Sequence, residues 1–225
     1  AMIIELHILQ NFAPSNLNRD DTNSPKECEF GGYRRARISS QCIKRAIRQE
    51  PIFQHILAQE LAKHTKLIAP RLKGTLPQDK QNAPESDAIV RGIIANLSTF
   101  DGSSDKTKVL LFIGEDEIQR MKDIILKEWD NLVDAHRRDS AEKDEKKRTA
   151  LAAKCKDAMK GFERTKSRSP DIALFGRMLA ENPGYNIDAA CQVAHAISTH
   201  KVGVEFDFYT AMDDIQPKEE PGAGM

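Results

Sequence analysis

The spacing of apolar residues changes twice along this 225-residue chain and limits the folds open to it. Apolar and polar residues alternate near both ends, at Ile4, Leu6 and Ile8 and again at Val202, Val204, Phe206 and Phe208. This two-residue period predicts half-buried strands over residues 2–9 and 202–208. Over residues 84–165 the apolar residues recur at helical spacing instead. The predicted fold class is therefore α+β, with a helical region inserted between strands.

Further elements follow from local signals in the first half of the chain. Residues 10–32 show little periodicity and predict a long loop, followed by a short basic strand over residues 33–38. Ser39 and Ser40 offer side-chain oxygens that cap a helix running to about Gln49. Pro51 predicts a break or the first turn of a further helix. Residues 67–85 predict a connector, and residues 89–97 predict a helix.

The second half of the chain is less regular. Residues 109–113 are wholly apolar and predict a buried strand, and the acidic residues 115–117 predict the first turn of a helix. The mixed charges of residues 137–148 predict a solvated helix surface or a flexible joint. Residues 171–175 predict a strand, and residues 189–199 predict either a strand or a short helix.

Composition excludes several classes of protein. Lys plus Arg and Asp plus Glu number 34 each, so only the distribution of charge can point to a nucleic acid. Four separated cysteines without a C-x-x-C pair argue against a zinc site or a secreted disulfide framework, and favour a reducing cytoplasm. No apolar run approaches the roughly 20 residues of a membrane span. We expect a cytoplasmic protein with no cofactor and no membrane partner.

One segment is strongly cationic. Residues 30–49 contain six basic residues and no acid, namely Arg34, Arg35, Arg37, Lys44, Arg45 and Arg48. In a helix that starts near Ser40, Lys44 and Arg48 share one face, while Ile43, Ala46 and Ile47 turn toward the core. The first-turn N–H groups, with Ser39, Ser40 and Gln41, add donors suited to phosphate oxygens. This pattern predicts a surface that binds a polyanion without reading its sequence.

Two other interpretations of this segment stay open. The arginines can instead pair with Asp and Glu elsewhere in the fold, as many surface arginines do. Strand alternation also points Arg34, Arg35 and Arg37 to opposite faces, so that some of them brace the fold. Phe30 and Tyr33 are the nearby aromatic candidates for stacking against bases, and we favour the interpretation of both as ordinary packing residues.

The same region resembles a known family. The pattern P-S-x-L-N-R-D-D followed by F-G-G-x-R-R-x-R-I-S-S-Q-x-x-K-R-A is similar to the amino-terminal signature of the CasC family, and it occurs here within residues 14–46. The stretches DIALFGRM at 171–178 and AHAISTHKV at 194–202, followed by DFYTAMDDI, resemble it too. CasC is the guide-RNA-coating backbone subunit of the type I-E CRISPR complex Cascade, in the RAMP superfamily.

The resemblance implies a hand-shaped protein. Its palm would be a modified ferredoxin-like or RRM-like sheet, with a first part at residues 1–83 and a second part at residues 166–225 leading into a thumb. Residues 84–165 would form helical fingers. Copies would stack head to tail along crRNA, a single-stranded guide RNA, beside other Cascade subunits, and would meet target DNA through the guide in antiviral defence.

The resemblance also implies site residues. Guide phosphates would be held by Arg19, Lys26, Ser39, Gln41, Lys44, Arg45 and Arg48. Arg177 would contact the RNA as well, and Met178 beside it in the same loop would wedge against bases. Members of the family continue well past residue 225, so we expect an incomplete palm and thumb. We therefore expect weak RNA binding and no long filaments from this chain.

Rival functions are an enzyme and a pure scaffold. Asp20 or Asp21 could bind Mg²⁺ and cut target RNA, as a loop Asp does in related type III complexes. The resemblance is to the type I branch, so we expect no catalytic residue and no metal. A scaffold without RNA contact leaves the basic segment unexplained. His195 and His200 lack the spacing of a helical zinc pair, and we expect both to be structural.

Overall fold

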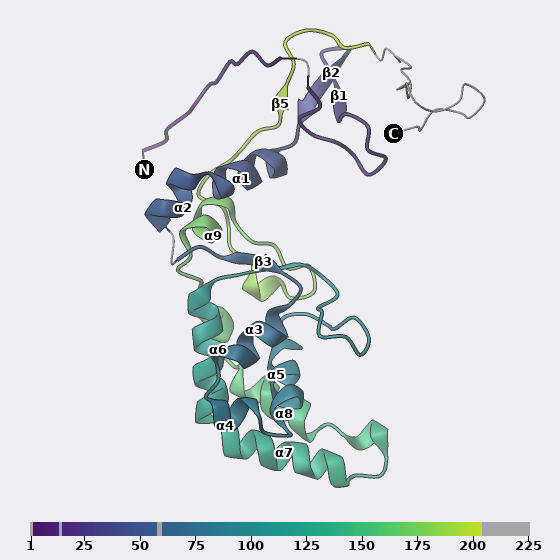
Figure 1. Ribbon diagram of the computed structural model, residues 1–225, viewed down its shortest axis with the longest axis vertical. Coiled ribbons are helices and arrows are strands. Elements are labelled where there is room, and N and C mark those ends of the chain that lie inside the picture. Colours follow the sequence, from purple (N-terminus) through teal and green to yellow (C-terminus); the bar gives the residue numbers. More distant parts are fainter. Residues whose placement is uncertain (1, 14, 58–59, 204–225) are drawn as a thin grey trace, which may run out of the picture. The chain divides into compact units, whose positions relative to one another are not determined.

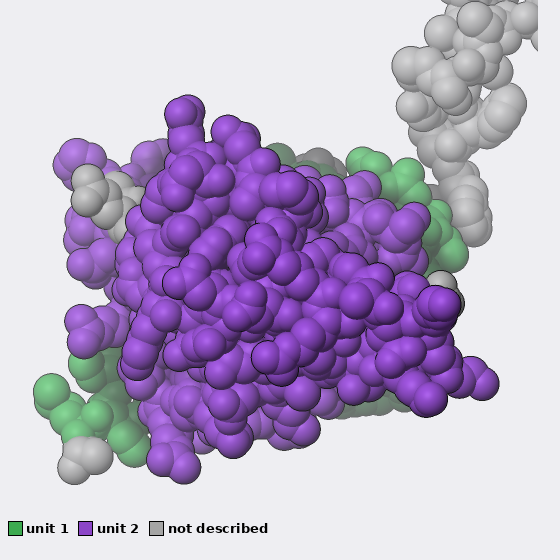
Figure 2. Space-filling view, turned by 90° about the horizontal axis from the view of Figure 1, so that it is seen from below, with its two compact units in different colours: residues 1–43, 194–225 green, residues 44–193 purple. Residues whose placement is uncertain are grey.

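The computed structural model describes residues 2–13, 15–57 and 60–203. The chain divides into two compact units, which Figure 2 colours separately. Unit 1 comprises residues 1–43 and 194–225, and unit 2 comprises residues 44–193. These boundaries do not coincide with the expected ones at residues 83 and 165. Helices together with small antiparallel sheets confirm the α+β class.

Unit 1 contains a three-stranded antiparallel sheet in the order β1-β2-β5. Strands β1 (Glu27–Phe30) and β2 (Tyr33–Ile38) form a hairpin, and β5 (Ala196–Ile197) pairs with the far edge of β2. The hairpin turn is Gly31–Gly32, with φ of 65° and 76°. Left-handed backbone at both positions is what a tight two-residue hairpin turn requires, and glycine adopts it without strain. Strand β1 lies inside the segment that was expected to be loop.

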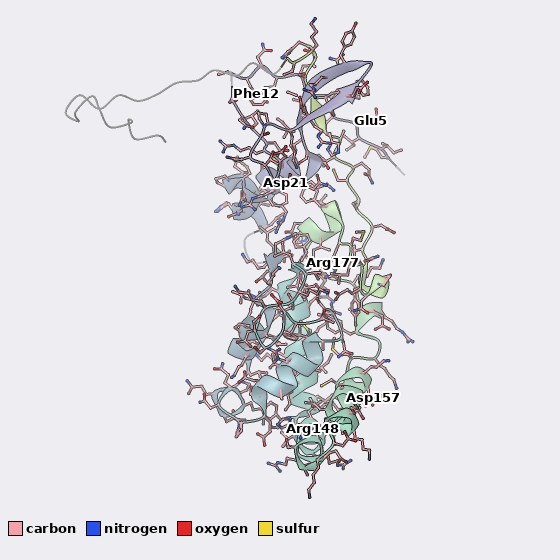
Figure 3. The ribbon with its side chains drawn as sticks, turned by 90° about the vertical axis from the view of Figure 1, so that its right-hand side faces the viewer. Glu5, Phe12, Asp21, Arg148, Asp157 and Arg177 are labelled. Carbon is pink, nitrogen blue, oxygen red and sulfur yellow. The ribbon has the colours of Figure 1, made fainter. Side chains whose placement is uncertain are left out.

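The predicted strand over residues 2–9 is wrong. These residues have no regular structure, and the side chains of Ile4, Leu6 and Ile8 are 75%, 83% and 79% exposed. A strand needs a neighbouring strand to satisfy its backbone N–H and C=O groups, and no such pairing is found for residues 2–9 among the described residues. Figure 3 labels Glu5 and Phe12 in this part of the chain. The predicted strand over residues 202–208 lies almost wholly outside the described residues.

Helices dominate unit 2 (Figure 1). Helix α1 (Ser40–Gln49) has the bounds that the sequence predicted, and the boundary between the units falls after Ile43. The other described α-helices are α2 (Pro51–Leu57), α3 (Ile68–Thr75), α4 (Gln78–Gln81), α5 (Ser86–Ile94), α6 (Glu115–Lys127), α7 (Trp129–Ala141), α8 (Ala150–Ala158) and α9 (Pro170–Phe175). Short 3-10 helices occupy Glu145–Lys147, Phe162–Arg164 and Pro183–Tyr185.

The core of unit 2 is built from helix faces. Buried apolar side chains of α3, α5, α6, α7 and α8 form one cluster, which includes Ile68, Leu72, Ile89, Ile93, Met121, Ile125 and Leu132. A two-stranded antiparallel sheet of β3 (Lys63–Thr65) and β4 (Leu111–Ile113) adjoins it. Strand β4 confirms the predicted buried strand. Burying these side chains is the main source of stability for such a helical unit.

Three helices were not predicted. Helices α3 and α4 fall in the expected connector over residues 67–85, where short helices between prolines leave little periodicity to detect. Helix α9 replaces the expected strand over residues 171–175, and Pro170 occupies its first turn, where proline favours a helix start. Within the described part of the chain, no helix has both the length and the apolar character needed to cross a membrane.

Candidate nucleic-acid interface

The cations of the hairpin have different environments. Arg34 pairs with Glu27 through a 3.3 Å Nε–Oε2 contact. Arg35 donates to the carbonyl oxygens of Phe30, Ser198 and Thr199 at 2.8–3.0 Å, so it braces the sheet without a carboxylate partner. Arg37 is half-buried, and its Nε has no hydrogen-bond partner. Arg35 and Arg37 therefore keep an uncompensated positive charge.

The loop before the hairpin is held by Asn18. The Asn18 carbonyl accepts the Lys26 N–H at 2.8 Å, and its side-chain oxygen accepts the Ser39 N–H at 2.9 Å. Arg19 is exposed, and among the described residues its Nη1 donates to the neutral Asn23 Oδ1 at 2.9 Å. With its side-chain O and N exchanged, the neutral Asn16 amide also accepts from Arg19 Nε at 3.2 Å. The Lys26 side chain has no carboxylate within ion-pair distance among the described residues. Arg19 and Lys26 thus remain available to an anion.

The amino-terminal end of α1 is largely satisfied by its own unit. The buried Ser39 accepts the Cys42 N–H on its Oγ at 3.4 Å, and the Ser40 N–H donates to His195 Nδ1 at 2.8 Å. Ser39 is therefore a helix cap rather than an open phosphate donor, which corrects the sequence-based expectation. His195 has the structural role that we expected. Gln41 is exposed and remains a possible contact.

Within unit 2, the three cations of α1 differ sharply. Arg48 Nε donates to the buried Asp171 Oδ2 at 2.9 Å, and its guanidinium lies 4.4 Å from the Phe112 ring centroid. Arg48 is thus neutralised inside the fold, and its predicted phosphate contact is corrected to a structural role. Lys44 Nζ lies 3.4 Å from the Phe175 carbonyl oxygen, without a carboxylate. Arg45 is exposed and has no hydrogen-bond or ion-pair partner among the described residues, so it is the freest cation of this helix.

The positive charges of Arg48 and Arg45 affect the pKa of the neighbouring His64. His64 packs on Phe112 with ring centroids 4.2 Å apart. Burial lowers the pKa of its imidazole below the ordinary value, and the positive charges of Arg48 and Arg45 lower it further, while Asp171 opposes them. The imidazole is therefore neutral at physiological pH.

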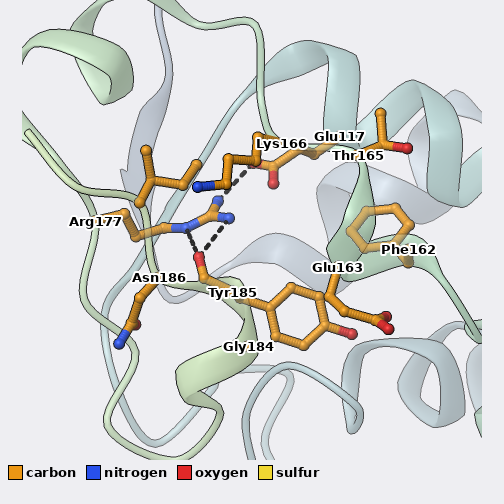
Figure 4. A pocket seen from close by; sticks show the side chains of 10 residues that line it. Glu117, Phe162, Glu163, Thr165, Lys166, Arg177, Gly184, Tyr185 and Asn186 are labelled. Atoms are coloured by element: carbon orange, nitrogen blue, oxygen red, sulfur yellow. Dashed lines mark hydrogen bonds and ion pairs between the residues drawn. The ribbon is translucent and has the colours of Figure 1, made fainter.

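Arg177 is buried, contrary to a role in RNA contact. Its Nη1 donates to Glu117 Oε2 at 2.7 Å and to the Phe112 carbonyl at 3.1 Å, and its other nitrogens donate to the Tyr185 carbonyl (Figure 4). All three guanidinium nitrogens are therefore occupied, and the expected RNA contact of Arg177 is corrected to a structural role. The neighbouring Met178 is 80% exposed and remains open to a ligand.

Asp20 shapes a turn. Its Oδ1 accepts the Thr22 N–H, the Thr22 hydroxyl and the Ser24 N–H at 2.8–3.0 Å. These bonds, with the Thr22 hydroxyl first, lower the pKa of the Asp20 carboxyl. Asp21 is exposed (Figure 3). No group of three or more His, Cys, Asp or Glu side chains that could hold a metal ion occurs in the described ranges.

The fold is similar to that of solved chains from one class of complex. The chain is similar to a solved chain of a "CRISPR RNA-guided surveillance complex, pre-nicking", with 31% identity and a TM-score of 0.63, covering 93% of this chain and 56% of that one. A second solved chain, of a "CRISPR RNA-guided surveillance complex", gives 31% identity and a TM-score of 0.61, covering 84% of this chain and 56% of that one. The present chain thus spans little more than half the length of these relatives.

The family itself follows from the sequence. Residues 4–225 match the CT1975-like protein family, so the chain belongs to this family of CRISPR-associated proteins. No curated protein sequence matches the chain.

Proposed function

We propose that the protein is a guide-RNA-binding backbone subunit of a CRISPR surveillance complex of the CasC kind. It binds crRNA through phosphates, without reading bases and without catalysing a reaction. Its partners are the guide RNA, further copies of itself stacked head to tail, the other Cascade subunits, and target DNA through the guide. The reducing cytoplasm suits its four free cysteines.

The observation that carries the proposal is a set of cations without carboxylate partners. Of the six in the acid-free segment, only Arg34 and Arg48 pair with an acid among the described residues. The uncompensated ones are Arg35, Arg37, Lys44 and Arg45, and outside the segment Arg19 and Lys26 join them. Uncompensated positive charge is stabilised when a phosphate backbone replaces small counterions. The similar solved chains come from RNA-guided complexes, which supports RNA as that polyanion.

The absence of catalysis is part of the proposal. One Asp20 oxygen already accepts three hydrogen bonds that hold a turn, so this carboxylate serves the loop. We expect labelled RNA to stay intact when it is incubated with the protein and Mg²⁺. Cleavage that disappears in Asp20→Ala or Asp21→Ala would instead establish a ribonuclease.

Charge reversal tests the RNA contact. Lys26→Glu and Arg45→Glu should each weaken binding of a fluorescent oligouridylate by about tenfold or more, because each replaces an attraction to phosphate by a repulsion. The control is Lys156→Glu, an exposed charge reversal on α8 outside the cationic segment. Binding is measured by fluorescence anisotropy, and folding by circular dichroism. Equal affinity of all three variants and the wild type would refute the proposal.

A further inference from the structure

The two faces of the β1–β2 hairpin, which is labelled in Figure 1, differ in the side chains that the register assigns to them. The register places Phe30 opposite Tyr33 and Cys28 opposite Arg35, and the Arg37 N–H donates to the Lys26 carbonyl, which continues the same pattern. Because side chains alternate across a strand, these three rows share one face. Glu27 and Glu29 point to the other face, together with Arg34. One face therefore has cations and aromatics without acids, and the other holds both acids of the hairpin.

The aromatic row lies at the turn and is open to solvent. Phe30 is 61% exposed and Tyr33 is 57% exposed, so the interpretation of both as packing residues is wrong. Side chains directly opposite in an antiparallel pair have Cβ atoms roughly 5 Å apart, so Phe30 and Tyr33 leave the backbone side by side. We call these two exposed side chains at the strand end the aromatic platform.

The backbone beneath the platform is well fixed. Gly31 and Gly32 close the turn in the left-handed conformation. Arg35 donates to the Phe30 carbonyl at 3.0 Å and to the Ser198 and Thr199 carbonyls at 3.0 and 2.8 Å, which ties both sides of β2 together. A platform whose support is already ordered loses little conformational entropy on binding.

We infer that Phe30 and Tyr33 stack against bases of single-stranded RNA, while Lys26, Arg35 and Arg37 on the same hairpin face attract the phosphates of that strand. This inference rests on the proposed function and assigns it a second kind of contact. Base-to-aromatic stacking beside a cationic track is how proteins bind single strands without sequence preference.

The dimensions of the face fit such a strand. Successive rows on one face are about 6.8 Å apart, twice the rise of a residue in an antiparallel strand, so three rows span roughly 14 Å. A nucleic-acid strand with stacked bases carries a phosphate about every 3.4 Å along its axis, so the face covers about four phosphates. A protein segment is the less favoured occupant, because three cations without an acid on the face would have to be matched by carboxylates.

Two probes separate stacking from phosphate binding. One is an oligouridylate and the other is an abasic oligonucleotide with the same number of phosphates. The wild type should prefer the oligouridylate. Phe30→Ala/Tyr33→Ala should lose about tenfold or more in affinity for it, because the base stacking is lost, and should keep its affinity for the abasic strand. Phe12→Ala is the control, because Phe12 is an exposed aromatic of the same unit outside the hairpin.

Each remaining outcome is decisive. Equal binding of both probes by the wild type, with no effect of the double variant, would overturn stacking and leave the proposed function intact. No binding of either probe would overturn both. A double variant that binds RNA normally but loses self-association in sedimentation would assign the platform to protein contact and overturn the inference. Thermal unfolding of the double variant checks that its fold is retained.

Discussion

A buried ion pair gives Arg177 its role. Glu117 Oε2 accepts both the Arg177 Nη1–H at 2.7 Å and the Gly114 N–H at 3.0 Å, which caps α6. Both side chains are almost fully buried. Removing one partner would leave the other charge buried without compensation, whereas removing both charges avoids this cost. The same reasoning applies to Arg48 and the buried Asp171.

Arg177→Met should lower the free energy of unfolding by about 3–5 kcal/mol, measured by urea denaturation, because the buried Glu117 then keeps only its longer, 3.9 Å contact with Arg120. Arg177→Met/Glu117→Gln should be less destabilised than the single variant. Met178→Ala is the matched control, and at an exposed position it should change stability by no more than about 0.5 kcal/mol. A single variant as stable as the wild type would contradict this structural role.

The close packing of α5 on α8 depends on a glycine. A Cβ added at Gly92 would lie 2.7 Å from the Cys155 Sγ, closer than side-chain atoms approach. Burial raises the pKa of the Cys155 thiol to about 12, so this cysteine packs as a small neutral side chain. The contact decides how near the two helices can lie.

Gly92→Ala should destabilise the protein by about 1–3 kcal/mol through overpacking, although alanine favours helices more than glycine does. Gly92→Ala/Cys155→Ala removes the clashing sulfur and should recover most of that loss. The control is Gly74→Ala in α3, where an added Cβ meets no atom within 4 Å and should be neutral or stabilising. Thermal unfolding measures these three variants together with Cys155→Ala, which the test of additivity requires. An additive double variant would show that the helices do not meet at this contact.

Elements governed by local signals were predictable, and those that need a distant partner were not. Helix α1 follows from its serine cap, and β4 follows from its apolar run. The expectation that Ile43, Ala46 and Ile47 turn toward the core is wrong, because Ile43 is only half-buried and Ala46 and Ile47 are exposed. Residues 2–9 carry a strand pattern but have no partner strand among the described residues. Residues 171–175 read as a strand because five residues are too few to separate the two periods.

The candidate interface was likewise predictable only in part. The sequence shows a segment of cations without acids, but it does not show which of these cations pair with an acid in the folded protein. Asp171 is 123 positions from Arg48, and Glu117 is 60 positions from Arg177, so tertiary folding alone brings these pairs together. The exposure of Phe30 and Tyr33 likewise depends on the hairpin register rather than on residue type.

At the scale of the whole molecule, zero net charge conceals the cationic segment. Lys plus Arg and Asp plus Glu balance at 34 each, so long-range attraction to RNA is weak. Affinity must then come from the few cations that contact phosphates directly. Such contacts release counterions, and the number released sets how steeply binding falls with salt.

The salt dependence of RNA affinity therefore indicates how many cations contact phosphates. If Arg19, Lys26, Arg35, Arg37, Lys44 and Arg45 all contact phosphates, the logarithm of the association constant should fall against the logarithm of salt concentration with a slope of about −4 for a single strand. Neutralising Lys26 or Arg45 to Gln should reduce that slope by about 0.7 each, and Lys156→Gln should leave it unchanged.

The slope also distinguishes the two units. Lys26 belongs to unit 1 and Arg45 to unit 2. If the salt slope is reduced in only one of the two Gln variants, the phosphate contacts lie on the unit that carries that residue. A change in both would show that each unit contributes phosphate contacts to one complex. A slope near zero in the wild type would mean that phosphates contribute little, and the cations of residues 34–48 would then need a different role. Anisotropy titrations with oligouridylate between low and physiological salt supply the measurement.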